Sequence, residues 1–248
     1  MHKHSFAEML PHFIAQIFYV HNLCYPNDAP MISPVAWSLE IEMQFYLIAP
    51  LLASLLYRFS PRTQLLLFPA LVVSIPFCLL PYCILPFKAL PAYLPYFIGG
   101  MGVATYRTNP SFILLTRRIS LHSSAWELVL GVILLLTIAF IPTTSNFILS
   151  GLRPSLVFLF FLVILSAPSW KYALSKAWIT TLGGMSYSIY LLHLATIAAT
   201  EKIALHWAIG NAFLPNFLLQ TLCCLPLTLI VSVIFYKFVE QPSMRMRI

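Results

Sequence analysis

Long runs of apolar residues, separated by short clusters of charged and turn-forming residues, dominate the chain. Eight of these runs have about the length that an α-helix needs to cross the hydrocarbon layer of a bilayer. They cover residues 6–23, 35–57, 64–84, 91–106, 126–142, 148–167, 183–203 and 216–238. The first run is the weakest, because polar residues and a proline interrupt it, and an interfacial helix is the alternative there. The pattern predicts an all-α protein, a polytopic transmembrane helical bundle of about eight spanning helices.

Composition supports the same class. Of the 248 residues, 60% are hydrophobic and 8% are charged, which is more apolar and less charged than soluble domains are. The net charge of +7 does not predict a nucleic-acid partner, because no soluble domain is visible on which basic residues could gather. The five cysteines lie mostly within apolar runs, without CxxC spacing or a histidine at metal-ligand spacing, so we expect no metal site.

The positions of lysine and arginine predict the orientation in the membrane. With the N-terminus in the cytoplasm, three basic residues fall outside, Lys88, Arg153 and Lys202. The others fall inside: Lys3, Arg58, Arg62, Arg107, Arg117, Arg118, Lys171, Lys176, Lys237, Arg245 and Arg247. An even number of spanning helices then returns the C-terminus to the cytoplasm. Glu42 would lie towards the outer half of the second helix.

Two carboxylates, Glu40 and Glu42, stand near the start of the second apolar run. An acidic side chain within a spanning helix costs about 2.5 to 3.5 kcal/mol even on lenient insertion scales, so such residues usually face the bundle interior and have a function. At helical spacing Ser38, Glu42 and Tyr46 share one face, and Glu40 and Gln44 lie on the roughly opposite one. The structural alternative is that Glu40 lies in the interface and Glu42 only hydrogen-bonds a neighbouring helix.

A second polar stripe opens the seventh run, where Ser186, Tyr190 and His193 share one helical face. Such a stripe predicts a hydrogen-bonded network rather than lipid contact, and it leaves open whether His193 supports the structure or takes part in chemistry. The connection 107–122 carries Arg107, Arg117 and Arg118, whose guanidinium groups suit phosphate. The alternative is that these arginines only anchor the protein at the cytoplasmic face.

These motifs resemble those of the acyltransferase 3 family, integral-membrane O-acyltransferases that modify bacterial cell-surface polysaccharides and have some eukaryotic relatives. The family motif WSLxxEEQFYLxxP is matched by Trp37, Ser38, Leu39, Glu42, Gln44, Phe45, Tyr46, Leu47 and Pro50, with Met43 at the second Glu. The late motif SYxxYLxH is matched by Ser186, Tyr187, Tyr190, Leu191 and His193, and the closing E-x-P by Glu240 and Pro242. The run His21-Asn22-Leu23 also resembles the segment that precedes the WSL motif in the family.

The resemblance implies transfer of an acyl group, most simply acetyl, from acyl-coenzyme A to a hydroxyl of a cell-surface carbohydrate. It implies a catalytic role for Glu42, with a supporting set of residues: Trp37, Ser38, Tyr46, Ser186, Tyr187, Tyr190 and His193. Acetyl-coenzyme A would be a co-substrate held by Arg107, Arg117 and Arg118, with no permanently bound cofactor. The expected location is the bacterial inner membrane, as a multi-pass protein with both termini in the cytoplasm.

One departure from the family pattern matters for activity. Family members begin with a helix that carries an Arg and, three helical turns later, a His usually taken as the catalytic base, and the sequence has no such pair. We therefore expect residues 1–248 to form a single acyltransferase 3-like membrane domain that is N-terminally truncated and catalytically impaired by itself. The alternatives are a non-catalytic remnant or assembly partner, and a small-solute transporter, since intramembrane carboxylates and histidines also serve transport.

Overall fold

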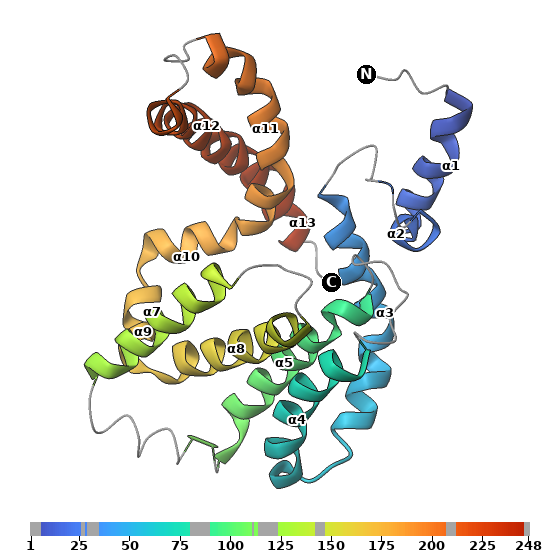
Figure 1. The fold of residues 1–248 in the computed structure, drawn as a ribbon, viewed down its shortest axis with the longest axis vertical. Coiled ribbons are helices and arrows are strands. Elements are labelled where there is room, and N and C mark those ends of the chain that lie inside the picture. The colour runs from blue at the N-terminus through green and yellow to red at the C-terminus, as the bar shows by residue number, and fades with distance from the viewer. Residues whose placement is uncertain are drawn as a thin grey trace. The chain divides into compact units, whose positions relative to one another are not determined.

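The computed structural model describes residues 6–25, 28, 35–79, 90–110, 112–113, 124–141, 147–206 and 212–245. All regular structure within these residues is helical, which confirms the predicted all-α class. The chain divides into two compact units, Met1–Ala173 and Leu174–Ile248. Figure 1 follows the helices in chain order from blue to red.

The first unit contains α1 (Phe6–Ile17), α2 (His21–Cys24), α3 (Ala36–Leu56), α4 (Pro61–Leu79), α5 (Leu90–Thr108), α7 (Ser124–Phe140), α8 (Phe147–Ser166) and α9 (Pro168–Leu174). The second unit contains α10 (Ala177–Gly184), α11 (Ser186–His206), α12 (Phe213–Phe235), the π-helical turn η1 (Tyr236–Glu240) and α13 (Gln241–Arg245).

Within the described residues, three stretches are long and apolar enough to cross a membrane: Ala36–Leu56, Pro61–Cys78 and Phe213–Met244. The number rises to five if each of two bent helix pairs is one span. The pair α8 and α9 bends by 86°, and the pair α10 and α11 bends by 66°. These apolar helices indicate a membrane protein, but the predicted eight spans are not confirmed.

The shortfall has physical causes that an apolar run does not reveal. Prolines and glycines lower the mean hydropathy of α5, and the apolar part of α7 is shorter than a full span. The first predicted run, 6–23, divides into α1 and α2, because Tyr19 takes a left-handed backbone conformation with φ of 57°. A non-glycine residue rarely adopts this conformation, and it turns the chain so that α2 packs against α3.

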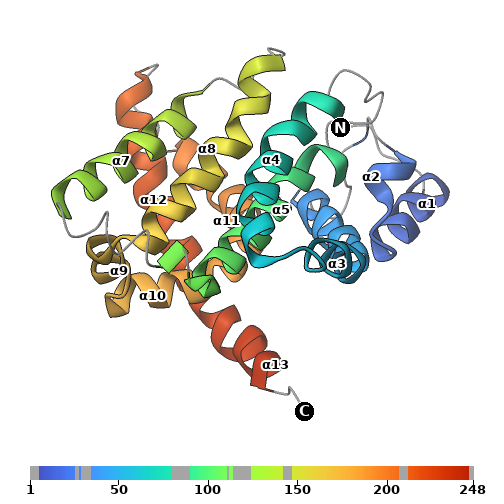
Figure 2. The same cartoon turned by 90° about the horizontal axis from the view of Figure 1, so that it is seen from below.

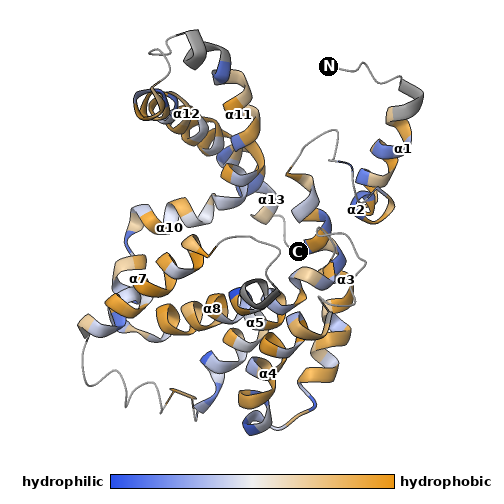
Figure 3. Cartoon of the chain, in the orientation of Figure 1, coloured by the Kyte–Doolittle hydropathy of each residue, from blue (hydrophilic) through white to orange (hydrophobic). Residues whose placement is uncertain are grey.

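The core of the first unit lies where α4, α5 and α8 pack together, side by side in Figures 1 and 2. Phe68 and Val72 of α4 are fully buried there, against Ile98 of α5 and Phe158 of α8. Figure 3 shows that α7 and α8 are predominantly hydrophobic along their lengths. Apolar surface on both the inner and the outer side of a helix is what a lipid-embedded bundle requires.

Close approach of α4 and α5 depends on Gly102. A Cβ atom added at Gly102 would lie 2.8 Å from Cβ of Phe68. The Phe68 Cβ is bonded directly to the α4 backbone, so relieving this contact would require α4 itself to shift. A Cβ atom added at Gly100, on the same helix, would meet nothing within 4 Å. The two glycines therefore differ in packing while sharing a helical backbone.

We expect Gly102→Ala to destabilise the first unit by about 1 to 3 kcal/mol, the usual cost of overpacking. Gly100→Ala should be neutral or slightly stabilising, because alanine is favoured over glycine in a helix by about 0.5 to 1 kcal/mol. Thermal unfolding in detergent measures the difference, at roughly 2 to 4 °C per kcal/mol. Equal unfolding temperatures for the two variants would contradict the packing described here.

The second unit is built on the pairing of α11 with α12, and polar side chains line their contact. The hydroxyls of Thr196 and Thr228 lie 2.6 Å apart, and Thr200 Oγ1 lies 2.9 Å from Cys224 Sγ. As the residue number rises along α11 it falls along α12, so the two helices are antiparallel. Hydrogen bonds between helices are one of the forces that associate helices in a membrane, where apolar contact alone gives little preference over lipid.

Candidate functional site

Glu40 is the centre of a buried polar cluster between α2 and α3. Its side chain is 1% exposed, and its Oε2 accepts a hydrogen bond of 2.8 Å from the backbone N–H of Asn22. One turn later, Gln44 Nε2 donates to Asn22 Oδ1 at 3.0 Å and to the carbonyl of Tyr19 at 3.1 Å. The Glu40 and Gln44 stripe of α3 thus holds α2 in place.

The sequence pattern placed two polar stripes on α3, and the structure shows which of them contacts α2. Glu40 is buried and Gln44 half-buried there, each with a hydrogen bond to Asn22. The reason is the break at Tyr19, which brings the backbone of α2 onto that side of α3.

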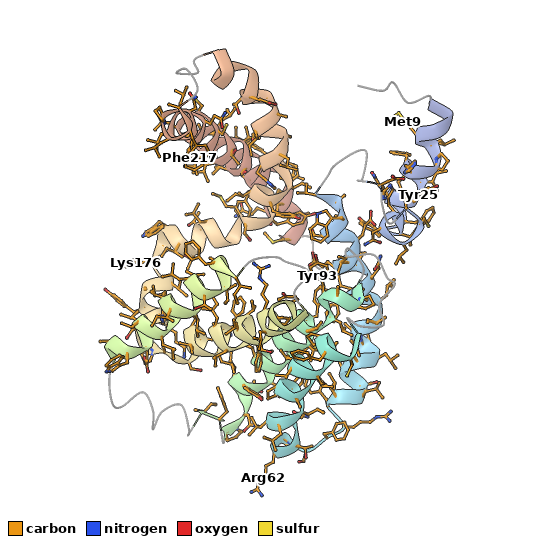
Figure 4. The ribbon with its side chains drawn as sticks, viewed as in Figure 1. Met9, Tyr25, Arg62, Tyr93, Lys176 and Phe217 are labelled. Atoms are coloured by element: carbon orange, nitrogen blue, oxygen red, sulfur yellow. The ribbon has the colours of Figure 1, made fainter. Side chains whose placement is uncertain are left out.

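Glu42 lies on the more accessible side of α3. Its Oε1 accepts a hydrogen bond of 2.5 Å from the hydroxyl of Tyr46, whose side chain is 55% exposed. Ser38 Oγ donates to the carbonyl of Val35 at 3.1 Å, at the start of the helix. The Trp37 ring lies 5.6 Å from the ring of Tyr93 on α5, which Figure 4 labels. Glu42 is therefore a half-buried carboxylate that a substrate or a further side chain can approach.

A pair of histidines beside the Glu40 cluster was missed by the sequence analysis. His12 Nδ1 lies 3.0 Å from Nε2 of the fully buried His21, and the His12 ring stacks on Tyr25 with centroids 4.0 Å apart. Nine residues separate the two histidines, which is not a spacing that places them on one face of a continuous helix. The resemblance of His21-Asn22-Leu23 to a family segment was the one signal present in the sequence.

The environment of His21 favours the neutral imidazole. Burial lowers the pKa of His21 below its usual value, the neighbouring His12 lowers it further, and Asp28 opposes both. His21 Nδ1 is buried with no hydrogen-bond partner in the described part of the chain. A neutral imidazole has one donor and one acceptor nitrogen, which suits a bond to His12.

In the second unit, the polar face that packs is not the one that the sequence favoured. The predicted stripe was Ser186, Tyr190 and His193, but Ser186 and Tyr190 are exposed, as is the neighbouring Tyr187. His193 Nδ1 lies 2.6 Å from the carbonyl of Tyr190 on its own helix. Ser188 is the fully buried residue of this motif, and its hydroxyl donates to Oε2 of Glu240 on η1. The reason is that α12 and η1 cover the Ser188 side of α11.

We expect Ser188→Ala to destabilise the second unit by about 1 kcal/mol, because interhelical hydrogen bonds in membranes contribute about 0.6 to 1.7 kcal/mol. Ser186→Ala is the matched control, since Ser186 is exposed on the same turn. Thermal unfolding in detergent should separate the two variants, and identical curves would show that the bond to Glu240 contributes nothing.

The predicted donor-binding arginines are described only in part. Arg107 is exposed in the last turn of α5, while Arg117 and Arg118 lie outside the described residues. Within the described part of the chain, no group of three His, Cys, Asp or Glu side chains is placed to hold a metal ion. The remaining site residues divide between the units, with Trp37, Ser38, Glu42 and Tyr46 in the first and Ser186, Tyr187, Tyr190 and His193 in the second.

Comparison with known proteins tests the resemblance. Residues 8–237 match the family model of acyltransferase 3, described as an acyltransferase domain. No curated protein and no solved structure matches the chain. The match extends over nearly all of the sequence and includes the α2–α3 cluster, the Glu42 motif and the Ser188 motif. The chain therefore belongs to the acyltransferase 3 family of membrane acyltransferases.

Proposed function

We propose that this protein transfers an acyl group, most simply acetyl, from acyl-coenzyme A to a hydroxyl of a cell-surface carbohydrate. Family membership over residues 8–237 supports the acyl-transfer chemistry, and the accessible Glu42 within the family motif is the observation that carries the proposal. The bacterial inner membrane is the proposed location, with the donor supplied from the cytoplasm.

The reaction needs a base, because a protonated hydroxyl is a poor nucleophile. The acceptor oxygen attacks the thioester carbonyl carbon, a C–O bond forms, and the C–S bond breaks to release the coenzyme A thiolate. The base takes the hydroxyl proton, a contribution worth about 10²- to 10⁴-fold, and the thiolate acquires a proton as it leaves. Hydrogen-bond donors must stabilise the oxyanion formed in between.

In this scheme Glu42 orients and charge-balances the basic imidazole, as the third member of a triad does. The family resemblance assigns the base to a histidine on a helix with an Arg partner, a pair that the sequence does not contain. The hydroxyl of Tyr46 donates a hydrogen bond to the Glu42 carboxylate. Ser38, Trp37, Ser186, Tyr187, Tyr190 and His193 are proposed as supporting residues.

The buried Glu40 cluster has a different task from Glu42. Its hydrogen bonds to Asn22 and the bonds of Gln44 fix α2 on α3, which sets the position of the whole motif. The two carboxylates are two residues apart, so they project from different faces of α3 and do not compete for one partner. Glu40 is thus a positioning residue and Glu42 the proposed catalytic one.

We expect the purified 248-residue chain to be impaired in transfer, because it lacks the Arg and His pair. The measurement is the consumption of labelled acetyl-coenzyme A by the chain in detergent with a polysaccharide acceptor. Robust transfer would show that the chain carries its own base, with the His12 and His21 pair as the first place to look. Proton-coupled uptake of a solute into proteoliposomes, without consumption of acyl-coenzyme A, would favour the transporter instead.

A further inference from the structure

Three exposed arginines lie where three helices of the first unit meet: Arg58 after α3, Arg62 in the first turn of α4 and Arg107 in the last turn of α5. Two hydrogen bonds join these helix ends. Thr105 Oγ1 donates to the Tyr57 hydroxyl at 3.3 Å, and Asn109 Nδ2 donates to the Pro61 carbonyl at 3.1 Å. Each of these bonds involves residues within two positions of an arginine. Figure 4 shows the Arg62 side chain extending away from α4.

The backbone beneath the arginines is held by further buried contacts. The Tyr106 hydroxyl donates to the Leu65 carbonyl, and Gln64 Nε2 donates to the Phe59 carbonyl at 2.8 Å. The backbone N–H of Thr63 donates to Ser60 Oγ at 3.2 Å, which caps the N-terminus of α4. Tyr106, Gln64 and Asn109 are buried. The backbone positions of the three arginines are therefore held together by these contacts.

The chain itself offers these arginines little negative charge. The sequence has no aspartate or glutamate between Glu42 and Glu127. Glu42 lies 16 residues before Arg58, which corresponds to about 24 Å along the α3 direction. At that distance, exposed charges are largely screened at physiological salt. An anion from outside the chain is therefore a suitable partner for this surface.

Two of the three arginines also stand at ends of candidate membrane spans, and the ends of spans are where headgroup phosphates lie. Arg58 follows the end of the candidate span Ala36–Leu56 by two residues, and Arg62 is the second residue of the candidate span Pro61–Cys78. The long arginine side chains can place their guanidinium groups at the headgroup level while their stems remain against apolar surface. Guanidinium binds phosphate oxygens in a bidentate way, which makes arginine well suited to this group.

We propose that Arg58, Arg62 and Arg107 form one phosphate-binding surface, the arginine platform. Two sources supply such a phosphate: the headgroup of an anionic phospholipid, or the phosphates of soluble coenzyme A. The arginine platform does not rest on the proposed acyl transfer, because binding is measured without turnover. If the donor is the source, the platform extends the role proposed for Arg107 to two further residues.

The test uses the full 248-residue chain in detergent and the triple variant R58Q/R62Q/R107Q. The control variant K171Q/K176Q/K237Q removes the same total charge from exposed lysines elsewhere, of which Figure 4 labels Lys176. Binding of short-chain phosphatidylglycerol, of short-chain phosphatidylcholine and of free coenzyme A is measured at two salt concentrations. Thermal unfolding of each variant shows whether it is folded.

We expect the arginine variant to lose at least tenfold in affinity for phosphatidylglycerol or coenzyme A, with the control variant within about twofold of wild type. Loss of phosphatidylglycerol binding alone identifies the lipid source, and loss of coenzyme A binding identifies the donor. Equal loss in both variants, or no loss in the arginine variant, would overturn the proposal. If the triple variant does not fold, R62Q alone should weaken binding by about fivefold, since the exposed Arg62 side chain extends away from α4.

Discussion

Glu42→Gln should lower acyl transfer by about 10²-fold or more, with protein levels unchanged. The comparison is made in membranes that carry the protein together with the family helix that bears the Arg and His pair. The amide preserves the shape of the side chain and can still accept a hydrogen bond from Tyr46, so the fold should tolerate it. It removes the negative charge that stabilises an imidazolium during the reaction. The measurement is the initial rate of label transfer from acyl-coenzyme A, normalised to the amount of protein.

Glu201→Gln is the matched control for this variant. Glu201 is an exposed carboxylate near the end of α11, outside every motif assigned to the site, and its loss should leave the rate unchanged. Tyr46→Phe, which removes the hydroxyl partner of Glu42, should have a smaller effect than Glu42→Gln. Wild-type turnover in Glu42→Gln would make Glu42 a structural residue.

The second large effect concerns Glu40 and is an effect on stability. Glu40→Ala should destabilise the first unit by about 2 to 4 kcal/mol, because it removes the buried acceptor of the Asn22 backbone N–H and opens a cavity. Glu40→Gln should cost much less, since the amide oxygen can replace Oε2 as the acceptor. Its amide nitrogen would occupy the position of Oε1, which already lacks a partner within the described residues.

Thermal unfolding of the purified chain in detergent measures this difference. Proteolysis in the segment that links α2 to α3 gives a local readout, because loss of the Asn22 contact should release α2 from α3. Together the variants distinguish the roles of the two carboxylates. Glu42→Gln should strongly lower the rate of transfer, and Glu40→Gln should lower the stability only slightly. Similar stability of Glu40→Ala and Glu40→Gln would contradict the hydrogen bond as the reason for burying Glu40.

The sequence pattern predicted the helices better than it predicted the spans. Most described residues of each predicted apolar run are helical, because long apolar stretches favour helix in a membrane. Hydropathy does not report bends between helices, however. The number of candidate membrane spans depends on whether the bent pairs α8–α9 and α10–α11 each count as one span. The left-handed Tyr19 likewise depends on the packing of α2 on α3 rather than on the local sequence.

For the candidate site too, the sequence identified the polar segments but not the way in which they pack. The motifs located Glu42 and the α11 polar segment, but helical spacing alone does not say which polar residues pack against a neighbouring helix. The structure packs Glu40 against α2 and Ser188 against η1. The histidine pair was hidden because a chain reversal, not a helical repeat, brings His12 to His21.

The measurement that tests the central claim most directly is transfer of a labelled acetyl group from acetyl-coenzyme A to carbohydrate, in membranes that contain the family helix with the Arg and His pair, with and without this protein. The account predicts label in the carbohydrate fraction that depends on the protein, is released by mild alkali as an ester should be, and disappears in Glu42→Gln. Equal label with and without the protein would contradict the assignment as an acyltransferase, provided that the protein is shown to be present and folded in the membranes that should carry it.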